Sequence, residues 1–395
     1  MTPGTASGAE RRTHASRRTP RVLAAVLAAT AVAALTAPPA RADGIRTQEW
    51  ALDALHVHDA WRTTKGDGIT VAVLDTGVDA THPDLKGQVL PGKDLIGFGA
   101  ARGDKTWADH GTAMSGIIAG HGHGHSDGVL GIAPEAKILP VRVILEDADP
   151  ERKKARTERA NALADGIRWA ADHGADVINL SLGDDSDSAH PEPREDAAVQ
   201  YALRKGVPVV ASAGNGGQHG DHVSYPAAYP GVIAVTAVDR YGTRARFSTR
   251  RWYATVSAPG VDVVIANPDR KYYEGWGTSA AAAYVSGAVA LVRAAHPHLR
   301  PAEIKQLLTE TARDTPAHGR NDDLGAGLVD PAAALAKGAP TKPLTSSRAT
   351  YSKRYFGAGP DARSTGTAGS WLPWTATAAG AALVAAAVVL WRRRA

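Results

Sequence analysis

The stretch that decides the fold is VAVLDTGVD, at residues 71–79. Its first half, Val71–Leu74, is a continuous apolar run, which is typical of a buried strand in a parallel sheet. The run ends at Asp75, followed by Thr76 and Gly77, where a polar turn closes the strand. In parallel sheets covered by helices, ligands bind beyond the carboxyl ends of the strands. Asp75 is therefore a candidate functional residue.

Apolar runs and helical stretches alternate across residues 43–337, and we expect the folded domain at 67–337. We expect strands at 70–74, 137–143, 177–180, 207–211 and 232–237, and helices near 111–120, 159–173, 196–205, 278–295 and 301–311. This alternation predicts an α/β domain whose central sheet is mostly parallel and is covered by helices on both faces. The polar residues that follow these strands include Asp75, Ser181 and Asn215.

Two further segments place a reactive side chain at the start of a predicted helix. They are DHGTAMSG at 109–116, which contains His110, and GWGTSAAAAYVSG at 275–287, which contains Ser279. Their glycines let a substrate approach the backbone closely. A serine hydroxyl is a poor nucleophile until an imidazole takes its proton, and a carboxylate fixes the tautomer of that imidazole. Asp75, His110 and Ser279 are therefore candidates for such a triad.

The three segments, in the chain order Asp, His, Ser, resemble the subtilisin-like serine peptidases, the family that shows this order. The opening QEWALDALHVHDAW at 48–61 is similar to the start of the mycosins, membrane-anchored subtilisin-like proteases associated with type VII secretion. The resemblance covers residues 48–337 and implies a subtilisin-like three-layer fold and an endopeptidase that acts on polypeptides. Other similar stretches are HPDL (82–85), GVLGIAPEA (128–136), INLSLG (178–183), ASAGN (211–215), SAPG (257–260) and GAGLVDPAAAL (325–335).

The resemblance also implies a role for each matching residue. Ser279 is expected to be the nucleophile, His110 the general base, and Asp75 the group that orients the imidazole. Asn215 is expected to donate its side-chain amide to the oxyanion, beside the backbone N–H of Ser279. The segment Ser181-Leu182-Gly183 is expected to bind the substrate as an added strand.

Two positions depart from the family pattern. Ala283 stands where members usually have proline, which supports an alternative in which the triad is dispensable or inactive and the protein is an anchored scaffold of a secretion complex. Asp84 matches a calcium ligand of many subtilisins, but the segment 121–125 reads HGHGH and offers imidazoles where calcium prefers oxygen ligands. We expect a flexible loop at 121–125, with a Zn²⁺ or Ni²⁺ site as the alternative. We expect no calcium and no other cofactor or metal.

Composition excludes several other classes of site and partner. The chain has no cysteine, which excludes disulfides, thiolate zinc sites, iron–sulfur clusters and a cysteine nucleophile. Its formal net charge is +5, but residues 1–42 contain six arginines and a single acid, and Arg392–Arg394 follow at the other end. Because the excess positive charge lies at the two ends, we expect no nucleic-acid partner.

The two ends predict attachment to a membrane. Residues 1–42 have arginines, a short apolar run and a small-residue cleavage site, which indicates a secretory signal peptide. Residues 371–391 are apolar, long enough to cross a bilayer and flanked by tryptophan, and the basic tail 392–395 predicts a cytoplasmic end. We therefore expect a single-pass cell-membrane protein whose catalytic domain is extracytoplasmic. A flexible stalk is expected at 338–370. The arm at 43–66 is too short for a folding propeptide of the usual subtilisin kind, and we expect it to pack on the domain.

Overall fold

The computed structural model describes residues 44–340. The predicted signal peptide, transmembrane helix and basic tail, and most of the predicted stalk, lie outside the described residues.

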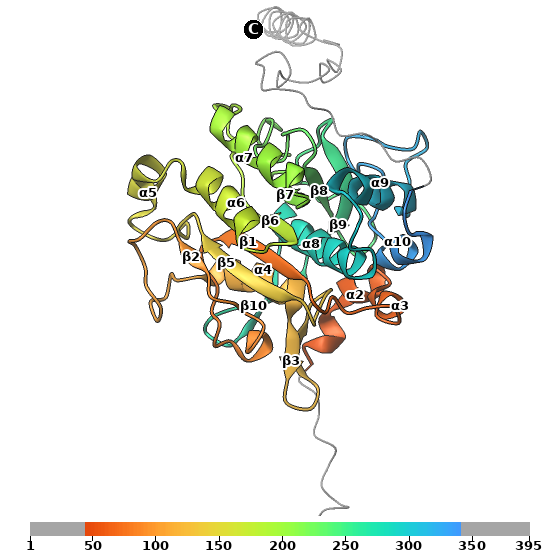
Figure 1. Cartoon of the computed structure of the whole chain (residues 1–395), viewed down its shortest axis with the longest axis horizontal. Coiled ribbons are helices and arrows are strands. Elements are labelled where there is room, and N and C mark those ends of the chain that lie inside the picture. The colour runs from red at the N-terminus through yellow and green to blue at the C-terminus, as the bar shows by residue number, and fades with distance from the viewer. Residues whose placement is uncertain (1–43, 341–395) are drawn as a thin grey trace, which may run out of the picture. The chain divides into compact units, whose positions relative to one another are not determined.

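Seven strands form one central sheet in the order β2-β5-β1-β6-β7-β8-β9 (Figure 1). Every neighbouring pair is parallel, which confirms the predicted parallel sheet. Strand β9 was not among the expected strands, because its sequence ATVSAP lacks a continuous apolar run. The strands are β1 (Thr70–Asp75), β2 (Lys93–Asp94), β5 (Lys137–Arg142), β6 (Val177–Leu180), β7 (Val209–Ser212), β8 (Ile233–Val238) and β9 (Ala254–Pro259).

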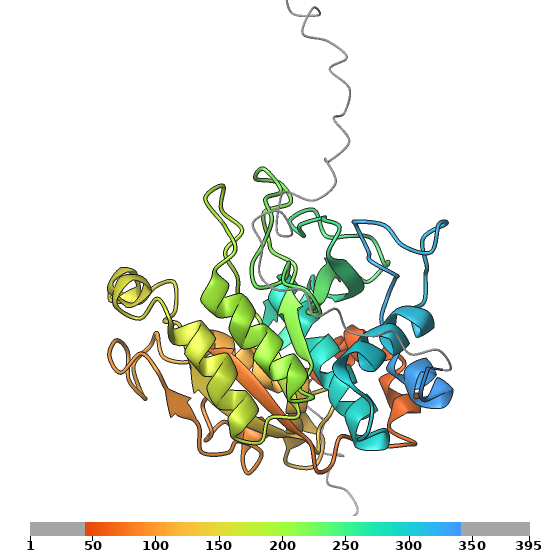
Figure 2. The ribbon, with the colours of Figure 1, turned by 45° about the horizontal axis from the view of Figure 1, so that its top comes forward.

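Helices cover both faces of this sheet. Figures 1 and 2 show α6 and α7 side by side in one layer, while α4 and α8 belong to the other layer. The predicted three-layer α/β architecture is thus confirmed. The helices are α2 (Trp50–Ala54), α3 (Val57–Ala60), α4 (Asp109–Ala119), α5 (Arg152–Glu158), α6 (Ala162–Asp172), α7 (Pro193–Arg204), α8 (Thr278–Ala295), α9 (Pro301–Thr311) and α10 (Pro331–Lys337), with 3₁₀ turns η1 (Arg46–Gln48) and η2 (Pro83–Leu85).

Successive strand residues face opposite layers, as the pleat of a strand requires. Val71 and Val73 pack in a core with α4 and α8, whereas Ala72 and Leu74 pack in a second core with α6 and α7. Because both faces of β1 are buried, residues 71–74 are all apolar rather than alternating. Asp75 ends the strand and is also fully buried.

Helix α8 lies at the centre of its layer and contacts β6, β7, β8 and β9. Among the helices of residues 44–340, α8 alone has the length and apolar composition needed to cross a membrane. However, 83% of this stretch is buried in the domain core. Its length and apolar character are therefore explained by its place in the core. Ala283 is wholly buried within it, and the helix continues through this position.

The N-terminal arm is part of the same core. Leu55 and Val57 are fully buried in the cluster that also contains β1 and α8. The indole nitrogen of Trp61 donates to the backbone oxygen of Ile132 at 2.8 Å. Apolar burial and this hydrogen bond hold the arm against the domain.

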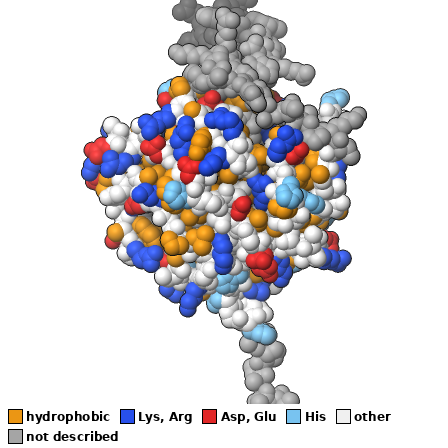
Figure 3. All heavy atoms as spheres, in the orientation of Figure 1, with side chains coloured by type: hydrophobic (Ala, Val, Ile, Leu, Met, Phe, Trp, Pro, Cys, Tyr) orange, Lys and Arg blue, Asp and Glu red, His pale blue; other side chains and the backbone are white. Residues whose placement is uncertain are grey.

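Two hairpins lie apart from the main sheet. One pairs β3 (His121–His123) with β4 (Asp127–Leu130), and the other pairs β10 (Val263–Ala266) with β11 (Tyr272–Gly275). The prediction of a flexible loop at 121–125 is therefore wrong for its first three residues. On the face shown in Figure 3, basic and acidic side chains are interspersed with small hydrophobic areas, which is typical of a solvent-exposed surface.

Candidate active site

Asp75 and His110 are directly hydrogen-bonded. Asp75 ends β1 and His110 lies in the first turn of α4, so the two elements meet at the carboxyl edge of the sheet. Nδ1 of His110 lies 2.8 and 2.9 Å from the two carboxylate oxygens of Asp75. The close approach depends on Gly111, because a Cβ there would lie 2.0 Å from the backbone oxygen of Gly77. The carboxylate thus fixes Nδ1 as the protonated nitrogen and leaves Nε2 to act as a base.

Several acids surround the imidazole. Partial burial lowers the pKa of His110, but the charge and hydrogen bond of Asp75, aided by Glu146 and Asp147, outweigh it and raise the pKa to about 9. Glu146 also accepts a hydrogen bond from the backbone N–H of His110 at 2.9 Å. Desolvation raises the pKa of Glu146 itself. The site therefore favours the imidazolium that forms when His110 takes a proton.

Ser279 lies in the first turn of α8, beside the loop that follows β6. Its hydroxyl donates to the backbone oxygen of Ser181 at 3.0 Å, and the hydroxyl of Ser181 donates to the backbone oxygen of Ser279 at 2.8 Å. Among residues 44–340, no hydrogen bond joins Ser279 to His110. A serine–imidazole contact often tightens only when substrate is bound, so this arrangement is compatible with nucleophilic catalysis.

Asn215 and the start of α8 form a cradle for a negatively charged oxygen. Oδ1 of Asn215 accepts from the backbone N–H and the hydroxyl of Thr278, at 3.0 and 2.9 Å, which assigns the orientation of the amide. A Cβ placed on Gly277 would lie 3.8 Å from Nδ2 of Asn215 and 3.6 Å from the backbone nitrogen of Ser279. Both nitrogens thus lie beside the space that a side chain at Gly277 would fill. This is the arrangement expected of an oxyanion hole.

The predicted substrate-binding segment follows β6. A Cβ on Gly183 would lie 2.8 Å from the hydroxyl of Ser224, so a side chain does not fit at this position. The backbone oxygen of Leu182 accepts from the hydroxyl of Ser212 at 3.3 Å. Within the described part of the chain, the backbone N–H and C=O of Gly183 make no hydrogen bond. They are therefore free to pair with an extended peptide.

Asp84 is the centre of a separate buried network. It is fully buried, and its carboxylate accepts from Nδ1 of His123 at 2.6 Å, from the hydroxyl of Tyr272 at 2.9 Å and from the backbone N–H of Val129 at 3.0 Å. His82, whose pKa is lowered by burial, lies alongside. No group of three or more potential metal-ligating side chains was found within residues 44–340. The histidine-rich segment thus supplies a partner for a buried carboxylate.

Two residues near the site were missed by the sequence reasoning. Glu146 follows β5, the neighbour of β1, so the rule that selected Asp75 could also have found it. Asp185 accepts from the backbone N–H of Asn215 at 2.6 Å and fixes the loop that carries the amide. No sequence signal pairs Asp185 with Asn215, because they are 30 residues apart in two different loops.

Comparisons with known proteins place this chain in the subtilase family. The profile of the subtilase family, the peptidase S8 family, matches residues 66–327. Fervidolysin of Fervidobacterium pennivorans is 39% identical over 321 residues, which cover 74% of this chain and 44% of fervidolysin. Subtilisin DY of Bacillus licheniformis is 35% identical over 272 residues, which cover 68% of this chain and 92% of subtilisin DY. This chain therefore spans less than half of fervidolysin but nearly all of subtilisin DY.

Solved structures agree on the fold. MycP1 of Mycobacterium smegmatis superposes with a TM-score of 0.65 at 30% identity, covering 77% of this chain and 88% of MycP1. A second MycP1 structure, of a serine protease described as an essential component of the type VII (ESX-1) secretion system, gives a TM-score of 0.63 at 32% identity, covering 76% and 91%. The identity to MycP1 is thus about the same as the identity to subtilisin DY.

Proposed function

Because this chain belongs to the subtilase family of serine peptidases, we propose that it hydrolyses polypeptides as an endopeptidase through Asp75, His110 and Ser279. The observation that carries the proposal is the Asp75–His110 pair at 2.8 and 2.9 Å, positioned at the same edge of the sheet as a serine that begins a helix. The nitrogens of Asn215 and Ser279 that lie beside Gly277 add the anion cradle that acyl transfer requires.

The reaction follows from these groups. Nε2 of His110 takes the hydroxyl proton as Oγ of Ser279 attacks the carbonyl carbon, and the C=O electron pair moves onto the oxygen. That oxyanion lies between Nδ2 of Asn215 and the backbone N–H of Ser279. The C–N bond then breaks as His110 gives its proton to the leaving amine. Water attacks the acyl-enzyme, His110 takes the proton of that water, and Oγ of Ser279 leaves and is reprotonated.

Extended peptides are the substrate class that this site favours. The unpaired N–H and C=O of Gly183 lie two residues beyond Ser181, whose backbone oxygen contacts the nucleophile. A peptide that pairs with Gly183 as an added strand would bring its own carbonyl groups toward Ser279. The direct test is hydrolysis of quenched fluorogenic peptides by the wild type and by Ser279→Ala. We expect the variant to lose kcat by about 10⁴–10⁶-fold, a magnitude taken over from subtilisin.

Membrane anchoring and a link to type VII secretion belong to the same proposal. The signal at 1–42 would direct the chain across the cell membrane, and the apolar segment 371–391 would then anchor the peptidase domain on the outer side. The likeness to MycP1 supports the secretion link. Deletion of 371–395 should release the protein from the membrane fraction; a variant that stays membrane-bound after deletion would contradict the anchor.

A scaffold role is the second candidate. It is favoured by the hydrogen bond of the Ser279 hydroxyl to Ser181 in place of His110. If Ser279→Ala supports secretion as well as the wild type does, the peptidase activity is dispensable for secretion and the scaffold role is supported.

A further inference from the structure

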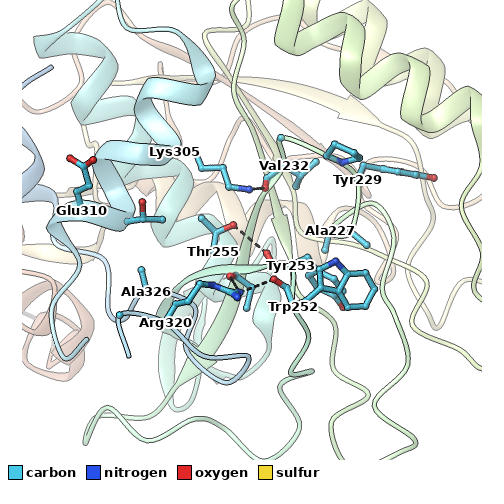
Figure 4. A pocket seen from close by; sticks show the side chains of 16 residues that line it. Ala227, Tyr229, Val232, Trp252, Tyr253, Thr255, Lys305, Glu310, Arg320 and Ala326 are labelled. Carbon is cyan, nitrogen blue, oxygen red and sulfur yellow. Dashed lines mark hydrogen bonds between the residues drawn. The ribbon is translucent and has the colours of Figure 1, made fainter. Parts of the chain in front are cut away.

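A pocket of about 560 Å³ lies at the edge of the sheet where β8 and β9 begin. Figure 4 shows the side chains that line it. Its walls come from the segment before β8, the start of β9, one face of α9 and the loop after α9. Asp75 and Asn215 lie at or beyond the carboxyl ends of parallel strands, whereas Val232 and Tyr253 of the pocket precede theirs. The pocket is therefore separate from the triad, and its volume is in the range of small-ligand sites.

Two cations, from different elements, line this pocket. Nζ of Lys305, on α9, donates to the backbone oxygen of Val232 at 2.6 Å, and Arg320 donates to the backbone oxygens of Trp252 and Ala254 at 2.7 and 3.2 Å. Figure 4 shows Lys305 reaching toward Val232, just before β8, and Arg320 reaching toward Trp252, just before β9. An ammonium group has three donors, so its bond to Val232 leaves Lys305 with further donors.

The positive charge of the pocket is not balanced by its own residues. Across residues 44–340, none of the ion pairs includes Lys305, and Arg320 reaches the carboxylate of Asp322 only at 4.0 Å. Glu310 is the one acid in the lining, and its carboxylate accepts from Lys337 at 2.8 Å and from Gln306 at 2.6 Å. Burial, and to a lesser extent Arg320, lowers the pKa of Lys305 to about 8. A bound anion would offset the repulsion from Arg320 and would stabilise the charged form of the buried Lys305.

The remaining walls are mostly aromatic and apolar, with two threonines, Thr255 and Thr309. Trp252 and Tyr253 line the pocket and contact each other edge to face, with ring centroids 5.2 Å apart. A small anion that only balanced the charge of Lys305 and Arg320 would leave the surface of Trp252 and Tyr253 uncovered. A ligand that fits the whole pocket therefore carries an apolar group beside its anionic group. We propose that the pocket binds a carboxylate carried on an apolar or aromatic body, with the carboxylate at Lys305 and Arg320 and the body against Trp252.

The experiment measures binding to the full-length protein by isothermal titration calorimetry at pH 7. The probes are N-acetylphenylalanine and its uncharged amide. We expect the acid to bind at least about tenfold more tightly than the amide, because a hydrogen bond to a charged group contributes about 1.5–3 kcal/mol. Equal binding of acid and amide, or no binding of either, would overturn the proposal.

Variants assign the binding to this pocket. Lys305→Met should weaken binding of the acid by about tenfold or more, and Lys305→Arg should retain it, because the charge is kept. Lys205→Met is the matched control, since Lys205 is a partly exposed lysine paired with Asp172, and should bind as the wild type does. Thermal unfolding of Lys305→Met checks that it is folded. Wild-type affinity in Lys305→Met would contradict the proposal.

A product-like acid could also bind at the triad, and Asn215→Ala separates the two sites. Binding that survives Asn215→Ala and is lost in Lys305→Met assigns the ligand to the pocket; the reverse pattern overturns the assignment. A longer acid, N-acetyl-Ala-Ala-Phe, then distinguishes two sources of the same chemistry. Tighter binding than N-acetylphenylalanine indicates the carboxyl terminus of a peptide, and equal binding indicates a small free carboxylate.

Discussion

Nδ1 of His110 lies 2.8 Å from one carboxylate oxygen of Asp75 and 2.9 Å from the other. Asp75 is wholly buried, so its charge is screened little by solvent and acts mainly on the imidazole. The pair therefore does two things: it holds the ring so that Nε2 is the free base, and it stabilises the protonated ring. The second effect is large here, because Glu146 and Asp147 add to it.

The first prediction concerns the pH profile. His110 can accept the proton of Ser279 only when it is neutral, and its pKa is raised to about 9. Below that pH most molecules carry the inactive imidazolium, so kcat/KM should rise about tenfold per pH unit and level off above about pH 9. An unperturbed histidine would give a midpoint near 6.5. A measured midpoint below 7 would contradict the electrostatic account of the site.

Glu146 should contribute to this midpoint. In Glu146→Gln the amide oxygen still accepts from the backbone N–H of His110, but the negative charge is gone. The pKa of His110 should therefore fall, and the midpoint of the profile should move to lower pH. Glu158→Gln, on exposed α5, is the matched control and should leave the profile unchanged. A midpoint that moves upward in Glu146→Gln would show that the charge of Glu146 does not raise the pKa of His110.

The oxyanion cradle makes a second kinetic prediction. Asn215→Ala removes a donor that acts on the transition state, so kcat should fall by about 10²–10³-fold with little change in KM, a magnitude taken over from subtilisin. Asp185→Ala should lower kcat by a smaller factor, because Asp185 only holds the backbone of Asn215. If Asn215→Ala changes KM and leaves kcat intact, Asn215 does not serve the oxyanion.

The Asp84 network makes a prediction about stability. Asp84→Ala leaves His123, Tyr272 and the N–H of Val129 without their acceptor, and should lower the free energy of unfolding by about 3 kcal/mol. Asp187→Ala, in an exposed loop, is the control. Urea unfolding measures both. A loss below about 1 kcal/mol for Asp84→Ala would mean that the network contributes little.

The same network predicts the response to metal removal. Each carboxylate oxygen of Asp84 already accepts from a protein donor, His123 at Oδ1 and Val129 and Tyr272 at Oδ2, so Asp84 is hydrogen-bonded without a cation. EDTA should therefore leave the thermal midpoint of the protein unchanged. A fall of several degrees that Ca²⁺ or Zn²⁺ reverses would show that a metal is bound.

Local sequence predicts the frame of this molecule well. The buried strand 70–74 is visible because residues 71–74 form a continuous apolar run, and the helix 278–295 because it is rich in apolar residues. The helix 301–311 is visible because proline opens it and apolar residues recur at helical spacing, at Ile304, Leu307 and Leu308. Helix α8 has the bounds expected of it, and β1 extends one residue further, to Asp75.

Contacts between distant segments are what the sequence could not supply. The tract at 121–125 has the composition of a loop, but its first three residues pair with β4 as a strand, and His123 contacts the buried Asp84, 39 residues away. Likewise, the acids around His110 come from the end of β1 and from the loop after β5, so their effect on its pKa depends on the folded structure.

The most direct test of the central claim is covalent labelling by a fluorophosphonate, which reacts with an activated serine. The full-length protein is treated at pH 9, beside Ser279→Ala and His110→Ala. The account predicts labelling of the wild type, none of Ser279→Ala, and little of His110→Ala, because the serine is then without its base. Labelling of Ser279→Ala equal to that of the wild type, or no labelling of folded wild type, would contradict it.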